Sequence, residues 1–190
     1  KWFAQIFRDP RFFQLVGRTL YYSAAVLIVS VPAPFILAML MNELRSKAFK
    51  RTVQTISYLP HFISWVTIAS LIYLFLSTDT SGILNNIREL LGAKNRIIFM
   101  KYPKNFPVVL SLSSVYKEMG WGSIIFLAAI ASIDPELYEA AQIDGASRVQ
   151  RMVSITLPSI AYVIVITFLL RVGYLLNAGF DQVFNLYNPM

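Results

Sequence analysis

The stretch Thr19–Met41, TLYYSAAVLIVSVPAPFILAMLM, runs for 23 residues without a charged side chain. About 20 predominantly apolar residues are enough for an α-helix to cross the ~30 Å hydrocarbon core of a bilayer. Pro32 and Pro34 lie inside the stretch and would break a soluble helix. In a membrane helix, neighbouring groups can satisfy the carbonyl oxygens that a proline leaves free. The stretch therefore predicts a membrane-spanning helix.

Three more segments have a similar character, and together they predict the fold class. They lie at roughly 52–78, 107–133 and 159–180, the second of these interrupted by Lys117 and Glu118 and the third by Arg171. Hydrophobic residues make up 56% of the chain and charged residues 14%, where a soluble domain carries about 25% charged residues. Alternation with a period of two is absent. We expect an all-α, polytopic transmembrane helical bundle with four spans, the second kinked near Pro60.

The segments between the spans differ in composition. Residues 1–18 interleave aromatic and basic side chains, which favours a helix in the membrane interface, although an ordinary linker remains an alternative. Residues 42–51 carry four basic residues, and 79–106 is a mixed loop. The chain has no cysteine, which excludes disulfides and thiolate metal sites, and its formal charge of +7 fits lipid headgroups better than nucleic acid.

Residues 134–158, DPELYEAAQIDGASRVQRMVSITLP, form the most informative connection. Asp134 and Pro135 are typical of a helix start, with aspartate as the N-cap and proline at the first helical position. Gly145 suits a sharp bend because it has no Cβ. Ser147 is suited to cap a second helix. We expect two short helices separated by a glycine turn, with Pro158 redirecting the chain into the fourth span.

The same segment resembles the cytoplasmic loop of permeases from binding-protein-dependent ABC importers. That loop reads EAA, three residues, G, nine residues, I, one residue, LP. All seven fixed positions and the frequent DGA form are present here, at Glu139, Ala140, Ala141, Asp144, Gly145, Ala146, Ile155, Leu157 and Pro158. The resemblance implies the helical core of a type I importer permease, with a MetI-like or MalF-like fold. Such permeases have about six helices, so residues 1–190 are expected to lack one helix at each end.

The resemblance also implies a mechanism and partners. In that family the loop, here 134–158, is a cytoplasmic coupling helix that docks on a separate ATPase subunit. This chain has no GxxxxGK[ST] phosphate loop, so ATP is expected on the partner and no cofactor on this chain. The alternative is that the small residues of this loop only pack it against its own protein.

Motifs on either side of this loop indicate which branch of the permease family the chain resembles. The segment Phe49–Val66, FKRTVQTISYLPHFISWV, the Gly-Trp-Gly at 120–122 and residues 177–180 resemble carbohydrate-importing permeases, particularly those for complex sugars. This implies a sugar or oligosaccharide importer in a bacterial cell membrane, with a second permease subunit forming a heterodimer and an extracytoplasmic solute-binding protein. The basic outer segments permit an acidic, polysaccharide-derived substrate, although lipid headgroups explain the same charges.

The orientation implied by the family conflicts with charge counting. With the 134–158 loop inside, 42–51 is also inside, and 1–18, 79–106 and 181–190 are outside. Cytoplasmic loops normally carry the excess of lysine and arginine. Here the inside loops hold six basic residues and the outside segments nine. The loop motif is the more specific signal, and it sets the orientation.

Charged side chains inside spans indicate candidate functional residues. Glu118 and Arg171 lie at similar depths from the outer ends of their spans, about 16 and 14 Å of helical rise, so we expect them to pair or to face one polar cavity. Lys117 is expected to extend toward the outer surface. The predicted translocation pathway comprises Glu118, Trp121, Arg171, Tyr174 and Asn177, and a purely structural ion pair is the alternative.

Other classes of function are less well supported. His61 is the only histidine, which argues against a histidine-based catalytic or metal site, so we expect neither a catalytic residue nor a metal. An importer of another small solute remains an alternative. A passive channel would account for the spans and not for the 134–158 pattern.

Overall fold

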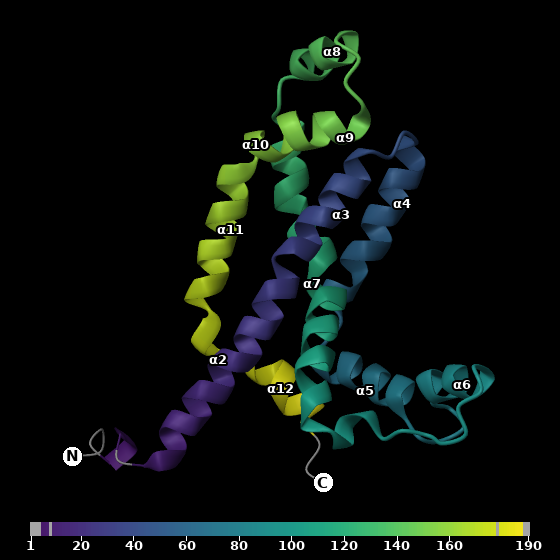
Figure 1. Ribbon diagram of the computed structural model, residues 1–190, viewed down its shortest axis with the longest axis vertical. Helices are drawn as coiled ribbons and strands as arrows, with labels where there is room; N and C mark the ends of the chain where they lie inside the picture. Colours follow the sequence, from purple (N-terminus) through teal and green to yellow (C-terminus); the bar gives the residue numbers. More distant parts are fainter. Residues whose placement is uncertain (1–4, 8, 178, 188–190) are drawn as a thin grey trace. The chain divides into compact units, whose positions relative to one another are not determined.

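The computed structural model describes residues 5–7, 9–177 and 179–187 (Figure 1). Within these ranges every regular element is a helix, as the sequence predicts. The chain forms two compact units. Unit 1 contains the described residues of 1–28, 63–114 and 174–190, and unit 2 contains 29–62 and 115–173.

The helices follow one another in the order drawn in Figure 1. The α-helices are α2 (Pro10–Ser30), α3 (Pro32–Asn42), α4 (Lys47–Tyr58), α5 (Trp65–Leu76), α6 (Ile83–Leu90), α7 (Phe106–Ala131), α8 (Pro135–Ile143), α9 (Arg148–Arg151), α10 (Leu157–Ser159), α11 (Ala161–Gly173) and α12 (Phe180–Leu186). Short 3-10 turns are η1 (Leu59–Phe62), η2 (Phe99–Lys101), η3 (Pro103–Asn105) and η5 (Leu175–Asn177), and η4 (Met152–Thr156) is a π-helical turn.

The first predicted span is confirmed, and its helical run is longer than expected. Residues Pro10–Asn42 form a run of 33 residues that is long and apolar enough to cross a membrane. The run starts well before Thr19, because residues 10–18 belong to the same helix, α2. Pro32 and Pro34 stand in the first turn of α3, after the turn at Val31. Proline is tolerated there because the first N–H groups of a helix have no intrahelical partner.

The other predicted spans are less regular. The second consists of α4 and α5 with η1 between them, and Pro60 lies in η1, in agreement with the predicted kink. In the fourth, α11 ends at Gly173, but the helical run continues to Asn177, close to the predicted end, and it follows a 60° bend after Arg148–Ser159. Each of these two helix pairs is long and apolar enough to cross a membrane only when its halves are taken as one span. The third, α7, is one continuous helix of 26 residues that contains both Lys117 and Glu118, and it is not among the described helices that are apolar enough to cross a membrane.

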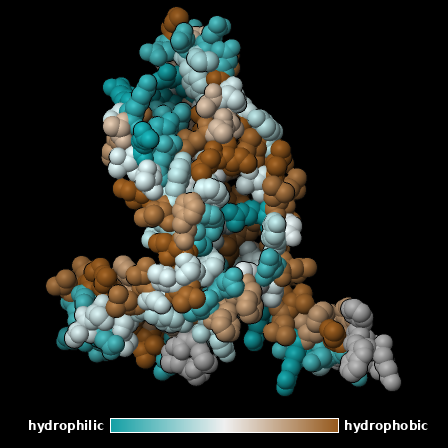
Figure 2. Space-filling view, turned by 180° about the vertical axis from the view of Figure 1, so that it is seen from behind, coloured by the Kyte–Doolittle hydropathy of each residue, from teal (hydrophilic) through white to brown (hydrophobic). Residues whose placement is uncertain are grey.

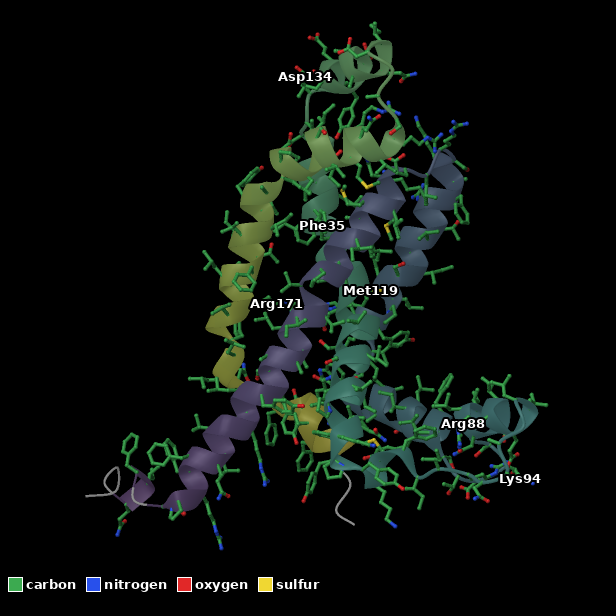
Figure 3. The ribbon with its side chains drawn as sticks, viewed as in Figure 1. Phe35, Arg88, Lys94, Met119, Asp134 and Arg171 are labelled. Atoms are coloured by element: carbon green, nitrogen blue, oxygen red, sulfur yellow. The ribbon has the colours of Figure 1, made fainter. Side chains whose placement is uncertain are left out.

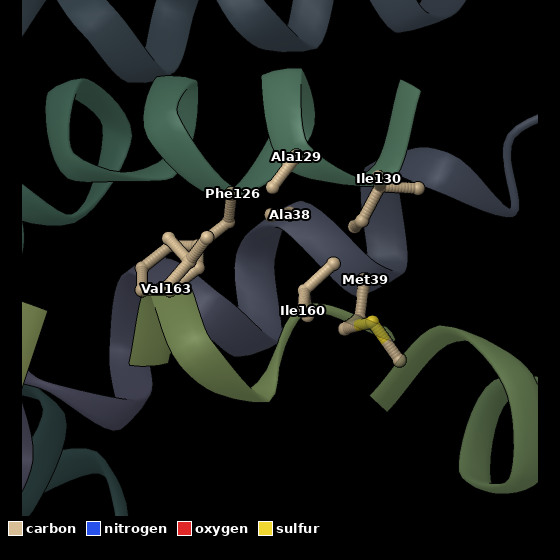
Figure 4. Packing of buried hydrophobic residues seen from close by; sticks show 7 residues of the cluster. All are labelled: Ala38, Met39, Phe126, Ala129, Ile130, Ile160 and Val163. Carbon is tan, nitrogen blue, oxygen red and sulfur yellow. The ribbon is translucent and has the colours of Figure 1, made fainter. Parts of the chain in front are cut away.

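Unit 2 has a hydrophobic core that joins three helices (Figure 4). Its buried members come from α3, from α7 and from the start of the α11 region: Ala38, Met39, Phe126, Ala129, Ile130, Ile160 and Val163. Phe35 packs edge-on against Phe126 with ring centroids 5.9 Å apart. The chain before residues 134–158 and the chain after them are therefore held in the same cluster.

Two glycines let α7 approach its neighbours in unit 2. A Cβ at Gly120 would overlap the carbonyl oxygen of Ser57 in α4, so only glycine allows this backbone contact. A Cβ at Gly122 would lie 3.0 Å from the ring of Pro34 in α3, which is tighter than ordinary contact. Small residues at such crossings are typical of membrane helices, where close packing stabilises association. The Gly-Trp-Gly motif thus has a structural role at both of its glycines.

Unit 1 has a smaller core and one feature that the sequence did not predict. Ala69, Leu110 and Leu186 are buried together, with Tyr22 and Phe106 packed edge-on beside them. The segment after residue 180, expected to be an outer tail, contains α12. The buried Gln182 donates from Nε2 to the carbonyl oxygen of Leu110 at 2.7 Å and to Ser113 Oγ at 2.8 Å. These bonds tie α12 to the N-terminal part of α7.

The glycine contacts make a direct prediction for stability. Gly120→Ala forces α7 and α4 apart and should destabilise the protein by about 1–3 kcal/mol, the usual cost of overpacking. Gly17→Ala is the matched control, because a Cβ there meets nothing within 4 Å and alanine is the better helix former. Thermal unfolding of the two variants in detergent measures the difference. Equal midpoints would contradict the close contact.

Candidate functional site

Residues 134–158, called the docking segment below, have the local structure that the sequence predicts. Asp134 caps α8 by accepting a hydrogen bond from the Glu136 N–H at 3.0 Å, and proline follows it at the first helical position. At the other end of α8, Gly145 has φ +78°. The Ala146 N–H donates to the Ala141 carbonyl oxygen at 2.9 Å, and the Gly145 N–H donates to that of Gln142 at 3.1 Å.

This pair of bonds is a Schellman cap, in which a left-handed residue ends the helix and satisfies its last carbonyl groups. An L-residue with a Cβ avoids that conformation, at a cost of roughly 1–2 kcal/mol. A Cβ at Gly145 would meet no atom within 4 Å, so the requirement for glycine comes from the backbone angle alone. The fixed glycine of the EAA pattern therefore has a physical explanation.

The second half of the docking segment is fastened to the first. Ser147 and Gln150 form a capping box at the start of α9, with both hydrogen bonds present. Arg151 Nη1 donates to Gln142 Oε1 at 3.3 Å, which links α9 to α8. Tyr138 Oη and Thr156 Oγ1, 2.8 Å apart, link α8 to the π-helical turn. Hydrogen bonds therefore link the parts of the segment to one another and give it a defined shape.

The exposed side chains of the docking segment include most of the motif. Glu139, Ala140, Asp144, Gly145 and Pro158 are exposed, while Ala141, Ala146, Ile155 and Leu157 are partly buried. Ile143 is 87% exposed, although no sequence argument singled it out. The signal that could have found it is its position at the last turn of α8, directly before the Asp-Gly pair. Figure 2 shows a largely hydrophilic surface in the part of unit 2 that carries α8.

A second cluster of polar groups lies on α7 and η1 within unit 2, and we call it the polar clasp: His61, Lys117, Glu118 and Trp121. His61 Nδ1 and Glu118 Oε2 form a hydrogen bond of 3.1 Å. The imidazole stacks on the Trp121 indole, with centroids 4.7 Å apart and 4° between the planes. Lys117 Nζ donates to the His61 carbonyl oxygen at 2.6 Å. The clasp thus fixes both the side chain and the backbone of His61.

The clasp changes two expectations about charged residues in spans. Glu118 pairs with His61, and among the described residues no ion pair joins it to Arg171, which lies on α11 (Figure 3). The predicted pairing with Arg171 is therefore not found. Lys117 is only 7% exposed, so the prediction that it extends to the outer surface is wrong. Its ammonium group donates instead to the backbone carbonyl oxygen of His61 in η1.

The predicted pathway residues fall in different units. Glu118, Trp121 and Arg171 belong to unit 2, and Tyr174 and Asn177 belong to unit 1. His61 was not expected in the polar group, because a lone histidine was weighed only as a catalytic or metal-binding residue. The relevant signal was a histidine within an apolar span, next to Pro60.

The comparisons with known proteins settle the family. The family model described as "Binding-protein-dependent transport system inner membrane component" matches residues 30–180, which include the clasp and the whole docking segment. The chain belongs to this family. Its members are inner membrane components, which agrees with the apolar helices found here.

Two curated relatives are similar to almost the whole chain. Protein LplB of Bacillus subtilis (strain 168) is 42% identical over 189 residues, which are 100% of this chain and 59% of the relative. The polygalacturonan/rhamnogalacturonan transport system permease protein YteP of the same organism is 42% identical over 99% of this chain and 58% of its own length. The chain thus spans about three fifths of the length of these relatives.

Two solved structures, both of a bacterial ABC transporter for the acidic polysaccharide alginate, are equally similar. The first, of the transporter involved in alginate import, has a chain with a TM-score of 0.90 and 41% identity, covering 98% of this chain and 65% of that chain. The second is of the alginate transporter in complex with an alginate pentasaccharide-bound periplasmic protein. Its chain has a TM-score of 0.91 and 41% identity over 98% of this chain and 64% of that chain. The helical permease fold is therefore shown.

The clasp predicts which residues are energetically coupled. Side chains that share a hydrogen bond typically show non-additive effects of about 0.5–3 kcal/mol in double-mutant cycles, while separate sites add within about 0.5 kcal/mol. The cycle of His61→Ala and Glu118→Ala should therefore be non-additive in unfolding free energy. The cycle of Arg171→Ala and Glu118→Ala is the control and should be additive. The reverse result would restore the Glu118–Arg171 pair.

Proposed function

We propose that this chain is the permease subunit of an ATP-driven importer of sugars or oligosaccharides in a bacterial cell membrane. The observation that carries the proposal is the docking segment, whose motif residues lie on two helices linked by hydrogen bonds. The family to which the chain belongs consists of transport components. The chain crosses the membrane several times and forms part of the translocation pathway. ATP is bound and hydrolysed on a separate ATPase subunit, and this chain carries no cofactor.

The geometry of the docking segment supports a mechanical role. Ala140 is small and exposed, so a partner surface can approach the α8 backbone closely. Glu139 and Asp144 offer exposed carboxylates to basic groups or backbone N–H donors. Ile143, 87% exposed, supplies an apolar contact at the same end. Such an arrangement, an apolar anchor rimmed by polar groups, suits a groove on a partner protein.

Force applied to this surface has a stiff route into the membrane helices. Side-chain hydrogen bonds link α8 to α9 and to η4 within the docking segment, and the helices on both sides of the segment share the core of unit 2. Movement of α8 therefore carries α7 and α11 with it. This route lets ATP-driven changes in a partner act on residues within the spans.

The predicted pathway residues remain the best candidates for contact with the transported solute. Trp121 is 45% exposed and Glu118 and His61 are partly exposed, so an aromatic face and hydrogen-bonding groups are accessible together. Sugars suit such surfaces because a ring can stack on an aromatic side chain while polar groups bind its hydroxyls. Arg171, Tyr174 and Asn177 complete the proposed set.

The relatives support a substrate class of complex and acidic sugars. The names of YteP and of the alginate transporter refer to acidic polysaccharides, and both proteins are more than 40% identical to this chain. The partners proposed by the same likeness are ABC ATPase subunits, a second permease subunit in a heterodimer, and an extracytoplasmic solute-binding protein. Import of another small solute is the second candidate, because a sn-glycerol-3-phosphate permease of Yersinia pestis is 34% identical over 94% of this chain.

Gly145→Ala tests the coupling role, and Gly92→Ala is its matched control. Both glycines end a helix with positive φ, +78° and +93°, and both form the same pair of backbone bonds. A methyl group added at either position would meet no atom within 4 Å. The two substitutions therefore impose the same local strain of roughly 1–2 kcal/mol. Only Gly145→Ala should lower ATPase co-purification and ATP-driven uptake in reconstituted vesicles.

The outcomes separate a coupling defect from a folding defect. Equal membrane levels of the two variants, with uptake lost in Gly145→Ala alone, support the proposal. Glu139→Gln should reduce ATPase association without changing the α8 cap, because Glu139 takes no part in the capping bonds. Normal uptake by both Gly145→Ala and Glu139→Gln would contradict docking through this segment.

Competition during uptake tests the substrate class. A labelled oligogalacturonate should be imported by the assembled transporter, and unlabelled oligogalacturonate should compete more strongly than a neutral oligosaccharide of equal length. Trp121→Ala should raise the concentration needed for half-maximal uptake, because it removes the large aromatic face on which a sugar ring would pack. Competition by glycerol 3-phosphate alone would favour the second candidate function.

A further inference from the structure

The helix α6 and its C-cap residue carry their apolar side chains on the outside of unit 1. Ile83, Leu84, Ile87, Leu90 and Leu91 are 40%, 37%, 46%, 87% and 82% exposed. Their spacing, i, i+1, i+4, i+7 and i+8, places them on one face of a helix. We call these five residues the α6 stripe. The region was expected to be a mixed loop, so this helix is a feature that only the structure reveals.

The polar face of α6 is turned onto the chain itself. Asn85 is fully buried; its Nδ2 donates to the carbonyl oxygens of Ser77 and Ile97 at 2.8 and 3.1 Å, and its Oδ1 accepts from the Ile97 N–H at 2.9 Å. Asn86 Nδ2 donates to the Thr80 carbonyl oxygen at 2.8 Å. An amphipathic helix on a soluble protein has the opposite orientation, with its apolar face inward.

An arginine locks this orientation. Arg96 binds Glu89 through two bonds, Nε to Oε1 at 2.8 Å and Nη2 to Oε2 at 2.9 Å. It also donates to Asn86 Oδ1 and to the carbonyl oxygens of Thr78 and Asp79. A bidentate arginine–carboxylate pair fixes direction as well as distance. The α6 stripe is therefore held outward by the loop's own polar contacts, before anything covers it.

We propose that the α6 stripe lies in the hydrocarbon boundary of the membrane and anchors the segment between α5 and α7 to lipid. The segment leaves α5 at Leu76 and enters α7 at Phe106, and both helices belong to the predicted spans. Within unit 1, α5 packs beside α6 and also exposes apolar side chains, Leu71, Leu74 and Phe75, so the stripe continues an apolar surface. In Figure 2 hydrophobic side chains gather along the part formed by α5 and α6.

The charges around the stripe match a lipid surface. Lys94, Lys101 and Lys104 are exposed, while Glu89 is neutralised by Arg96. Figure 3 places Lys94 at the turn that follows α6. Tyr102 is half exposed, and the Lys104 ammonium group lies 5.8 Å from its ring centroid. Tyrosine and lysine beside an apolar face are typical of the headgroup region, where lysine is attracted to anionic lipids.

This anchor goes beyond the proposed transport function, because it concerns how an outer segment is held and not what is carried. A helix at the hydrocarbon boundary buries apolar side chains without crossing the bilayer. Here it would limit the movement of the chain at the N-terminal end of α7. A protein partner that covers the stripe is the competing occupant, and lipid alone is the occupant argued here.

Site-directed spin labelling tests the proposal in the full-length protein. Leu90→Cys and Ile87→Cys lie one turn apart on the stripe, and Lys94→Cys is the control on the same segment; these 190 residues contain no native cysteine. Each labelled protein is reconstituted in vesicles of phosphatidylethanolamine and phosphatidylglycerol, without partner proteins. Collision rates with oxygen, which enters lipid, and with a water-soluble nickel chelate are measured.

The expected result is a several-fold higher ratio of oxygen to nickel collisions at positions 87 and 90 than at 94. Equal ratios at all three positions would overturn the lipid anchor. So would a label at 90 that is accessible to nickel in vesicles and becomes shielded only when a solute-binding protein is added. Uptake measured on the unlabelled transporter is independent of these ratios, so failure of the anchor and failure of the transport proposal are distinguishable.

Discussion

The backbone contact between α7 at Gly120 and α4 at Ser57 is the constraint on which the rest of unit 2 depends. A side chain larger than hydrogen at position 120 would separate the two helices. At their present separation, Glu118 reaches the imidazole of His61 and Lys117 reaches its carbonyl oxygen. Gly122 extends the close approach to Pro34, next to the residues of α3 that enter the core. The Gly-Trp-Gly motif therefore places the clasp and supports the core with the same three residues.

In the membrane location proposed for these helices, the polar contacts of the clasp matter more than they would in water. A buried polar group without a partner is costly, and within a bilayer water is not available to replace one. The turn η1 contains His61, and Lys117 Nζ donates from α7 to the His61 carbonyl oxygen. A charged residue within one predicted span thus binds the backbone of another segment.

The parts that could be predicted from the sequence are those with local causes. Asp134, Pro135, Gly145 and Ser147 specify their helix ends through their own backbones and side chains, and all four have the predicted roles. Long uncharged runs predict helices because a backbone surrounded by lipid must satisfy its own hydrogen-bonding groups. The pairing of Glu118 could not be predicted in this way. Counting residues along a span gives the depth of a side chain but not the direction in which it points. The turn η1 brings His61 to Glu118 from a different segment. The helix α6 was missed because its polar face, usually a sign of solvent, is satisfied internally by Asn85, Asn86 and Arg96.

The two Schellman caps show how one local structure serves different roles in different surroundings. Gly92 and Gly145 end their helices with the same pair of backbone bonds. After Gly145 the chain returns through a capping box and two side-chain links to α8, and both flanking helices are buried in one core. A load on that turn is carried by the packed helices of unit 2. After Gly92 the chain continues as a loop held mainly by Arg96 and Asn85. The same turn there ends a helix whose outward side chains are apolar, so what distinguishes the two is the packing behind each glycine and not the glycine itself.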